Sequence, residues 1–224
     1  MNALLVCAAP SPGAADLVER LAASADLVIA VDGGGAVCRD AGVRPDVLVG
    51  DFDSLPGHLV DEFVGMGVRV VEFPAEKDDT DLVLALDLAR REGADTVTVT
   101  AASTGRLDHT LAVVGALSAA ADLRPRLREP ELSGWVISTA RGARLRLKGV
   151  GATVSLIAPG WSATVSVRGV RWPLSRASLA PLSALGVSNV ITDPEGAVVE
   201  VHEGTVFVLS PHEVVRSAVE VSER

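Results

Sequence analysis

The sequence predicts two parts, an α/β N-terminal domain with a mostly parallel sheet and then a small all-β sandwich domain. From residue 3 to about 122, short β-branched runs alternate with helical patterns, which is typical of a parallel α/β sheet. Beyond this point short strands follow one another with little helical signal. We expect the α/β domain over residues 1–123, a linker over 124–133 and the sandwich over 134–224.

The N-terminal domain is expected to contain five strands with helices between them. The clearest helix follows Asp78, where apolar residues repeat at helical spacing until Gly93 stops them. Asp78 or Asp79 is expected to cap this helix, and the next helix is expected over residues 107–121. The predicted strands are residues 3–8, 27–31, 47–49, 68–71 and 96–100.

A charged stretch with two prolines, residues 124–130, is expected to form the boundary, because a helix does not readily cross such a sequence. Glycine-containing turns then separate most of the following strands. The strands predicted for the sandwich are residues 134–139, 143–147, 153–157, 163–167, 187–191, 197–201 and 205–209.

Composition narrows the classes of partner. The net charge of −9 disfavours nucleic acid and anionic membranes as partners, because both are bound through basic surfaces.

Two cysteines, Cys7 and Cys38, lie in stretches expected to be core, so the sequence fits a reducing, cytoplasmic location better than a disulfide framework. The first ten residues are read as a strand, because they are too short and uncharged for a signal peptide. No window is apolar for long enough to span a bilayer.

A glycine run, Gly33 to Gly35, follows Asp32 at the carboxyl end of the second predicted strand. Ligands bind at this edge of α/β sheets, and glycines allow the backbone to approach a phosphate closely. The alternative is an ordinary tight turn between a strand and a helix.

Two aspartates, Asp51 and Asp53, follow the third predicted strand in the run Gly50-Asp-Phe-Asp-Ser54. In an extended segment alternate side chains share a face, so both carboxylates can approach one hard cation. Mg²⁺ is the expected ion, because it binds one or two carboxylates together with phosphate oxygens. The alternative is that the pair caps a helix beginning near Pro56.

Two further polar turns follow the fourth and fifth predicted strands. The first is Lys77-Asp-Asp-Thr-Asp81, where Asp78 and Asp81 are expected on the first helical turn. The second is Ser103-Thr-Gly-Arg-Leu-Asp-His109. Here Arg106 can hold phosphate oxygens, and Asp108 can either orient Arg106 or join the metal shell. His109 is read as structural more readily than as a base. Four such turns at four strand ends together predict a phosphate and magnesium site.

These motifs resemble the thiamine pyrophosphokinase family over nearly the whole chain. The matching segments are Asp32-Gly-Gly, Gly50-Asp-Phe-Asp-Ser54, Lys77-Asp-Asp-Thr-Asp-Leu82, Gly105-Arg-Leu-Asp-His109 and Gly169-Val-Arg-Trp-Pro-Leu174.

The resemblance implies ATP-dependent transfer of a pyrophosphoryl group to thiamine, in which the acceptor hydroxyl attacks the β-phosphorus and AMP leaves. It also implies Mg²⁺ as the cofactor and a homodimer with active sites between subunits. The implied metal ligands are Asp51, Asp53 and Asp81, with Arg106 completing the catalytic set. The implied nucleotide and phosphate site contains Asp32, Gly33, Gly34, Lys77, Asp78, Thr80, Gly105, Asp108 and His109. The implied thiamine side contains Trp172, Ser188 and Asn189.

The sequence departs from the family pattern at two places. Ala101, Ala102 and Thr104 stand in a run that is usually richer in glycine, and Val190 stands where the family has glutamate after Ser188-Asn189. The second change keeps open a diphosphokinase for another hydroxymethyl heterocycle, such as a pterin. Two other readings are a phosphohydrolase with an Asp-x-Asp nucleophile and a relative that binds thiamine without turnover.

Overall fold

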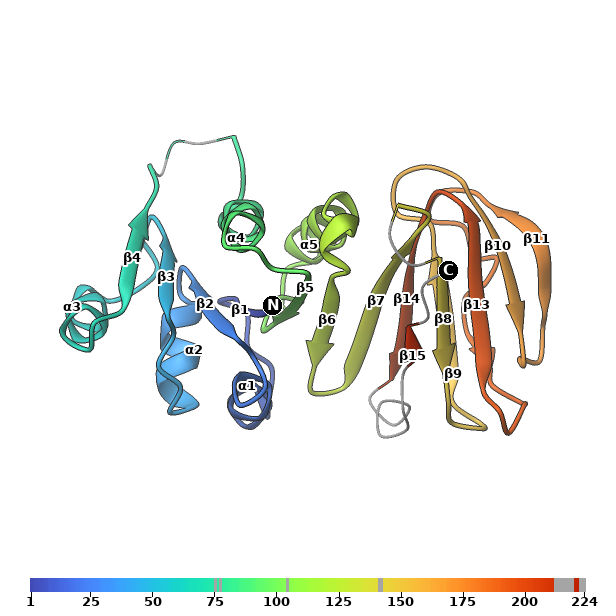
Figure 1. Cartoon of the computed structure of the whole chain (residues 1–224), viewed down its shortest axis with the longest axis horizontal. Helices are drawn as coiled ribbons and strands as arrows, with labels where there is room; N and C mark the ends of the chain where they lie inside the picture. Colours follow the sequence, from blue (N-terminus) through green and yellow to red (C-terminus); the bar gives the residue numbers. More distant parts are fainter. Residues whose placement is uncertain (75, 77, 104, 141–142, 212–219, 222–224) are drawn as a thin grey trace. The chain divides into compact units, whose positions relative to one another are not determined.

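The structure is a computed structural model that describes residues 1–74, 76, 78–103, 105–140, 143–211 and 220–221. The chain divides into two compact units. The first comprises Met1–Ala116 and Arg128–Pro130, and the second comprises Leu117–Leu127 and the chain from Glu131 onward. The first is an α/β unit and the second is built from antiparallel strands, which confirms the predicted fold class (Figure 1).

Five parallel strands form the sheet of the first unit, in the order β5-β1-β2-β3-β4. Each begins and ends within two residues of its predicted limits. Apolar β-branched runs place these strands correctly because both faces of the sheet are covered. The strands are β1 (Asn2–Val6), β2 (Leu27–Val31), β3 (Val47–Gly50), β4 (Arg69–Glu72) and β5 (Thr96–Thr100).

Helices cover both faces of this sheet. Leu4, Val28 and Leu48 belong to one buried cluster that also contains side chains of α1, α2 and α3. Successive strand residues point to opposite faces, and α4 contacts β2 and β3 on the face away from α1 and α2 (Figure 1). The helices are α1 (Ala14–Ala22), α2 (Gly34–Asp40), α3 (Gly57–Gly65), α4 (Asp81–Arg91) and α5 (Leu107–Ala119).

The start of α4 differs from the prediction. Thr80, and neither Asp78 nor Asp79, occupies the N-cap position, and no side chain caps the helix there. Asp78 therefore lies before the helix, and Asp81 is its first residue. The prediction that Asp78 and Asp81 share the first turn was wrong, because it placed the helix start too early.

The strand order places a ligand-binding edge beside β1. The chain runs from β1 outward to β4 and then returns to place β5 on the other side of β1. At such a reversal of strand order the connections diverge, and the carboxyl ends of the neighbouring strands leave a crevice between them. The connections after β1 and β5 are therefore the first place to look for a site.

The second unit contains two antiparallel sheets. One has the order β12-β9-β14-β7, and the other has the order β11-β10-β13-β8-β15. The strands are β7 (Leu132–Ser138), β8 (Arg144–Leu147), β9 (Thr153–Ile157), β10 (Ala163–Arg168), β11 (Leu174–Leu179), β12 (Asn189–Val190), β13 (Ala197–Glu203), β14 (Thr205–Pro211) and β15 (Glu220–Val221).

Four features of this part of the chain differ from the prediction, and one of them is strand β15, which lies beyond the last predicted strand. Strand β11 pairs with β10, but the sequence Leu174–Leu179 contains two serines and an arginine that hide the apolar alternation. Strand β12 is shorter than the strand predicted over residues 187–191. The predicted linker, residues 124–133, contains β6 (Arg126–Glu129) after a short 3₁₀ helix, Ala121–Leu123.

One apolar core joins the two sheets of the second unit. It includes Trp135 of β7, which is 2% exposed, together with Leu145 of β8 and Val165 of β10. Side chains from both sheets meet in this cluster, as in a sandwich. Across the described residues, no helix has the length and apolarity needed to cross a membrane.

Candidate active site

A pocket of about 380 Å³ opens at the carboxyl ends of β1, β2 and β5. Its lining includes four residues predicted for the site, Asp32, Thr80, Asp81 and His109. Cys7 also lines it, and burial raises the pKa of this thiol, so it remains protonated and unreactive. The pocket therefore occupies the crevice that the strand order places beside β1.

Asp32 sits in a strained turn directly after β2. Its φ of 50° lies in the left-handed region, which is uncommon for a residue with a side chain. The turn is held by its N–H, which donates to the carbonyl oxygen of Val49 over 2.6 Å, and by Ser54, whose hydroxyl donates to Oδ2. The other oxygen, Oδ1, is buried without a hydrogen-bond partner in the described part of the chain.

Close backbone contacts explain why glycines surround this aspartate. A Cβ atom on Gly34 would lie 1.9 Å from the carbonyl oxygen of Val6, so only glycine fits there. A Cβ atom on Gly50 would lie 3.0 Å from Cα of Asp32. These contacts bring the ends of β1, β2 and β3 together.

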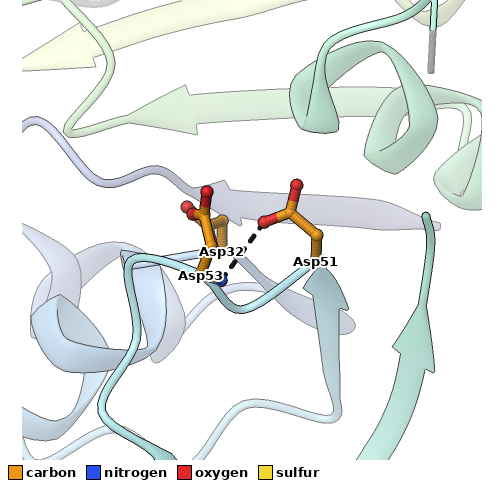
Figure 2. A group of neighbouring side chains, drawn as sticks. All are labelled: Asp32, Asp51 and Asp53. Atoms are coloured by element: carbon orange, nitrogen blue, oxygen red, sulfur yellow. Dashed lines mark hydrogen bonds between the residues drawn. The ribbon is translucent and has the colours of Figure 1, made fainter. Parts of the chain in front are cut away.

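The segment Asp51 to Asp53 forms a turn and is not extended. Phe52 has a φ of 59°, and the N–H of Asp53 donates to Oδ1 of Asp51 over 3.2 Å (Figure 2). The prediction of an extended segment was therefore wrong, because the turn, and not strand alternation, sets the direction of both carboxylates. Pro56 occupies the N-cap of α3 without a side-chain cap, so the capping alternative finds no support.

Asp32, Asp51 and Asp53 form a group whose ligand atoms all lie within 4.8 Å of one another (Figure 2). The charge of Asp51 is the main cause that raises the pKa of Asp53, and Asp32 adds to it. Close carboxylates repel unless a proton or cation lies between them. Together with the unsatisfied Oδ1 of Asp32, this geometry fits a divalent cation.

Asp81 lies near this group without belonging to it. Asp81 lines the same pocket as Asp32, and its charge also raises the pKa of Asp53. The carboxylate group within reach of one ion, as far as the described residues show, contains Asp32 where the resemblance implied Asp81. Gly33 is the N-cap of α2, and the exposed Asp78 precedes Thr80. Lys77 and Thr104 lie outside the described residues.

Arg106 and Asp108 form a two-point ion pair at the start of α5. The Nε atom of Arg106 lies 3.2 Å from Oδ1 of Asp108, and Nη2 lies 2.6 Å from Oδ2. This contact lowers the pKa of Asp108 to about 2. Both side chains are about two-thirds exposed, and the described lining of the pocket contains neither of them, although it contains His109. Gly105 precedes them with a φ of 85°.

Sequence reasoning missed Glu129. It lies on β6, in the stretch predicted to be a linker, and is only 4% exposed. Its carboxylate accepts hydrogen bonds from the residues that follow β5. Burial raises its pKa, and these hydrogen bonds oppose the shift. The signal in the sequence was weak, because charged neighbours made this glutamate look like a surface residue.

The three residues predicted for the thiamine side lie in the second unit, and two of them are in direct contact. Asn189 is 3% exposed and binds the main chain of Trp172 at two points: Nδ2 donates to the Trp172 carbonyl over 2.7 Å, and Oδ1 accepts from its N–H over 3.1 Å. The Trp172 side chain is 56% exposed, which excludes a core role. Arg171 packs 5.5 Å from its ring centroid, and the N–H of Ser188 donates to Ser155.

Two family models match the chain. Residues 18–127 match the model described as thiamin pyrophosphokinase, catalytic domain, and residues 143–206 match thiamin pyrophosphokinase, vitamin B1 binding domain. The first match contains the pocket and the carboxylate group, and the second contains Trp172 and Asn189.

Individual relatives agree with the family models. Thiamine pyrophosphokinase from Bacillus subtilis (strain 168) is 38% identical over 85 residues, which cover 38% of this chain and 40% of the relative. Thiamine pyrophosphokinase 1 from Oryza sativa subsp. japonica is 24% identical over 159 residues, which cover 67% of this chain and 60% of the relative. The matches thus span less than two thirds of these relatives. A crystal structure of thiamine pyrophosphokinase from Bacillus subtilis has the same fold, with a TM-score of 0.77 and 23% identity. The match covers 94% of this chain and 99% of the chain in that structure.

Proposed function

Because this chain belongs to the thiamine pyrophosphokinase family, we propose that it transfers a pyrophosphoryl group from ATP to thiamine, giving thiamine diphosphate and AMP. The observation that carries the proposal is the carboxylate group of Asp32, Asp51 and Asp53 beside a pocket at the carboxyl edge of the sheet. Such an arrangement suits a polyphosphate bound with a cation.

Mg²⁺ is the cofactor that these residues would hold. We propose Asp51, Asp53 and Asp32 as its ligands, and we retain Asp81 as a further candidate because it lines the same pocket as Asp32. When bound, the ion neutralises charge on phosphate oxygens. Carboxylate oxygens are the ligands that this hard cation prefers, and the unsatisfied Oδ1 of Asp32 is available for it.

The remaining residues would bind and orient the nucleotide. Arg106 contacts Asp108 at two points beside the start of α5. We propose that it turns toward the pocket to hold the transferred group once the nucleotide is bound. Thr80 and His109 line the pocket. Gly33 and Gly34 stay predicted phosphate contacts, and in the structure they allow close packing against Ala8 and Val6. Lys77, Asp78 and Gly105 stay predicted members of this site.

The reaction breaks the bond between the α-phosphate oxygen and the β-phosphorus of ATP and forms a bond from the thiamine hydroxyl oxygen to that phosphorus. The hydroxyl proton leaves to solvent or to a nearby carboxylate, and the leaving group is AMP. Catalysis of this kind rests on positioning and on compensation of charge.

The second unit would bind the acceptor. We propose that Trp172 stacks on the thiamine rings, since it is exposed and heteroaromatic rings stack well on indole. Asn189 would act through the main chain of Trp172 because its own amide is buried and already occupied. Ser188 stays a predicted contact. We also propose a homodimer with active sites between subunits and a cytoplasmic location.

The second candidate function is a diphosphokinase for another hydroxymethyl heterocycle, such as a pterin. The specific observation behind it is Val190, which stands beside Asn189 where the family has a glutamate. A valine removes a carboxylate that could bind a cationic acceptor. It leaves the cluster of Asp32, Asp51 and Asp53 unchanged, so the donor chemistry would be shared.

One experiment separates these candidates. The protein is incubated with Mg²⁺, ATP and either thiamine or a hydroxymethylpterin, and AMP is measured over time. We expect AMP with thiamine only, and Asp53→Asn is expected to lower this rate by about 100-fold or more, as loss of charge stabilisation at a reacting phosphate does. Glu92→Gln is the control because it removes the same charge from a surface ion pair with Arg69. AMP with the pterin alone would reverse the assignment.

A further inference from the structure

Glu129 is a buried carboxylate that the chemistry proposed above does not use. It accepts four hydrogen bonds from three consecutive residues of the connection after β5. Oε1 accepts from the N–H of Ala102 over 2.8 Å and from the N–H and hydroxyl of Ser103, each over 3.1 Å. Oε2 accepts from the N–H of Ala101 over 3.2 Å. Glu129 and this connection belong to the same compact unit.

The backbone of this connection has a shape that needs an anion. Ala101 has a φ of 53°, which is unfavourable for a residue with a Cβ atom. Consecutive N–H groups that point toward one place form a nest, and a nest stabilises a negative charge at its centre. Burial of a carboxylate is also unfavourable unless donors surround it. The buried Glu129 carboxylate thus stabilises the unfavourable backbone of residues 101–103, and the N–H groups of these residues stabilise the buried charge.

The connection held in this way forms a wall of the pocket. Ala102 lines it directly, and His109 and Val113 of the helix that follows line it as well. The carbonyl oxygen of Ala101 accepts from the N–H of Ala9, which lines the pocket on the β1 side. Movement of residues 101–103 would therefore displace both the wall and the start of α5, where Arg106 stands.

We infer that Glu129 is a positioning residue for the transfer reaction: its carboxylate fixes residues 101–103 and thereby the wall of the nucleotide pocket and the start of α5. The expected effect on the transfer reaction rests on the proposed function. The expected effect on residues 101–103 rests on the hydrogen bonds alone. A merely structural Glu129 would change the folded fraction but not the kinetic constants of the folded enzyme.

The test uses Glu129→Gln, whose amide NH₂ opposes the N–H donors, and Glu129→Asp, which keeps the charge on a shorter side chain. Glu92→Gln is the matched control, because it removes a carboxylate charge elsewhere on the same unit. Hydrogen exchange is measured by NMR at the amides of Ala101, Ala102 and Ser103. Affinity for Mg²⁺ and ATP is measured by calorimetry. AMP formation is measured with ATP and thiamine varied separately.

We expect faster exchange at the three amides in Glu129→Gln, and kcat/KM for ATP lower by about 10- to 100-fold, the loss that a small misplacement causes. KM for thiamine is expected to stay unchanged in Glu129→Gln. For Glu129→Asp, the exchange rates and kcat/KM for ATP are expected to lie between those of Glu129→Gln and the wild type. For the control Glu92→Gln, both quantities are expected to match the wild type. Wild-type exchange and wild-type ATP affinity in Glu129→Gln would overturn the inference.

Two further outcomes are informative. If Glu129→Gln does not fold, Glu129→Asp carries the test, and normal kinetic constants with normal exchange in that variant would overturn the inference. If the wild type forms no AMP with thiamine, the proposed function fails. Glu129 is then still tested by the exchange rates and by ATP affinity, so the two failures are distinguishable.

Discussion

Ser54 donates a hydrogen bond from its hydroxyl to Oδ2 of Asp32, which joins the turn after β3 to the turn after β2. This contact orients one oxygen of Asp32 and leaves the buried Oδ1 available to a cation. Groups that orient metal ligands matter almost as much as the ligands themselves. The contact therefore makes a prediction about metal affinity that does not depend on the identity of the acceptor.

Ser54→Ala is expected to lower affinity for Mg²⁺ by about 10- to 100-fold, the usual effect of removing such a partner. The measurement is the Mg²⁺ concentration that gives half-maximal AMP formation, supported by calorimetry with Mg²⁺ alone. Ser24→Ala is the control, since the Ser24 hydroxyl donates to the carbonyl oxygen of Leu21 at the exposed end of α1, away from the carboxylates. Equal Mg²⁺ dependence in all three proteins would remove Asp32 from the metal site.

The carboxylate group also predicts how metal affects stability. The folded-state pKa of Asp53 is raised, chiefly by Asp51, so the folded protein holds this proton to a higher pH than the unfolded chain does. Stability from this group is thus present at low pH and is lost as pH rises from the unfolded pKa through the raised one. At neutral pH without metal, the charged Asp53 opposes folding.

Asp53→Asn is therefore expected to raise Tm at neutral pH in the presence of a chelator and to reduce the increase in Tm that Mg²⁺ causes. Differential scanning calorimetry with and without Mg²⁺ measures both effects. Asp61→Asn, on the exposed side of α3, removes the same charge outside the group and is expected to change neither. A lower Tm for Asp53→Asn in chelator would contradict the account.

Gly34 gives a prediction about the turn that holds Asp32. Gly34→Ala is expected to destabilise the fold by about 3 kcal/mol or more, because its Cβ would overlap the carbonyl oxygen of Val6. Gly115→Ala is the matched control: Gly115 lies in α5 with open space around it, so alanine is expected to stabilise the helix by up to about 1 kcal/mol. Denaturant unfolding measures both, and a stable Gly34→Ala would contradict the close contact.

Asn189 gives a prediction about the acceptor side. If it acts through Trp172, Asn189→Ala is expected to raise KM for thiamine by about 10-fold, consistent with loss of one or two hydrogen bonds, and to leave KM for ATP unchanged. Trp172→Ala is expected to raise KM for thiamine more than Asn189→Ala does. The double variant is expected to be no worse than Trp172→Ala alone, because the two changes remove one contact. Fully additive effects would contradict a role through Trp172.

The strands of the first unit could be predicted from the sequence because its sheet is buried on both faces. Apolar β-branched runs mark such strands directly, and β2 and β5 have the limits that the pattern gives. The polar turns could be placed at one edge because parallel strands end together. Strand β11, in contrast, has a mixed pattern and is defined by its pairing with β10, which no local signal reveals.

The local geometry of the site could not be predicted in the same way. Phe52 adopts a left-handed conformation that its type disfavours, so an extended reading of Asp51 to Asp53 was reasonable and wrong. Asp32 joins Asp51 and Asp53 through contacts between different strands, which spacing along the chain does not encode. Glu129 stands among arginines and prolines, and only the folded chain shows that it is buried.

The most direct test of the account is ³¹P NMR of the purified protein with Mg²⁺, ATP and thiamine. The proposed transfer yields AMP and thiamine diphosphate in equal amounts, because the bond broken lies between the α- and β-phosphates of ATP. A chelator is expected to stop both products together. Release of ADP or inorganic phosphate, or no AMP at saturating thiamine, would contradict the proposed transfer.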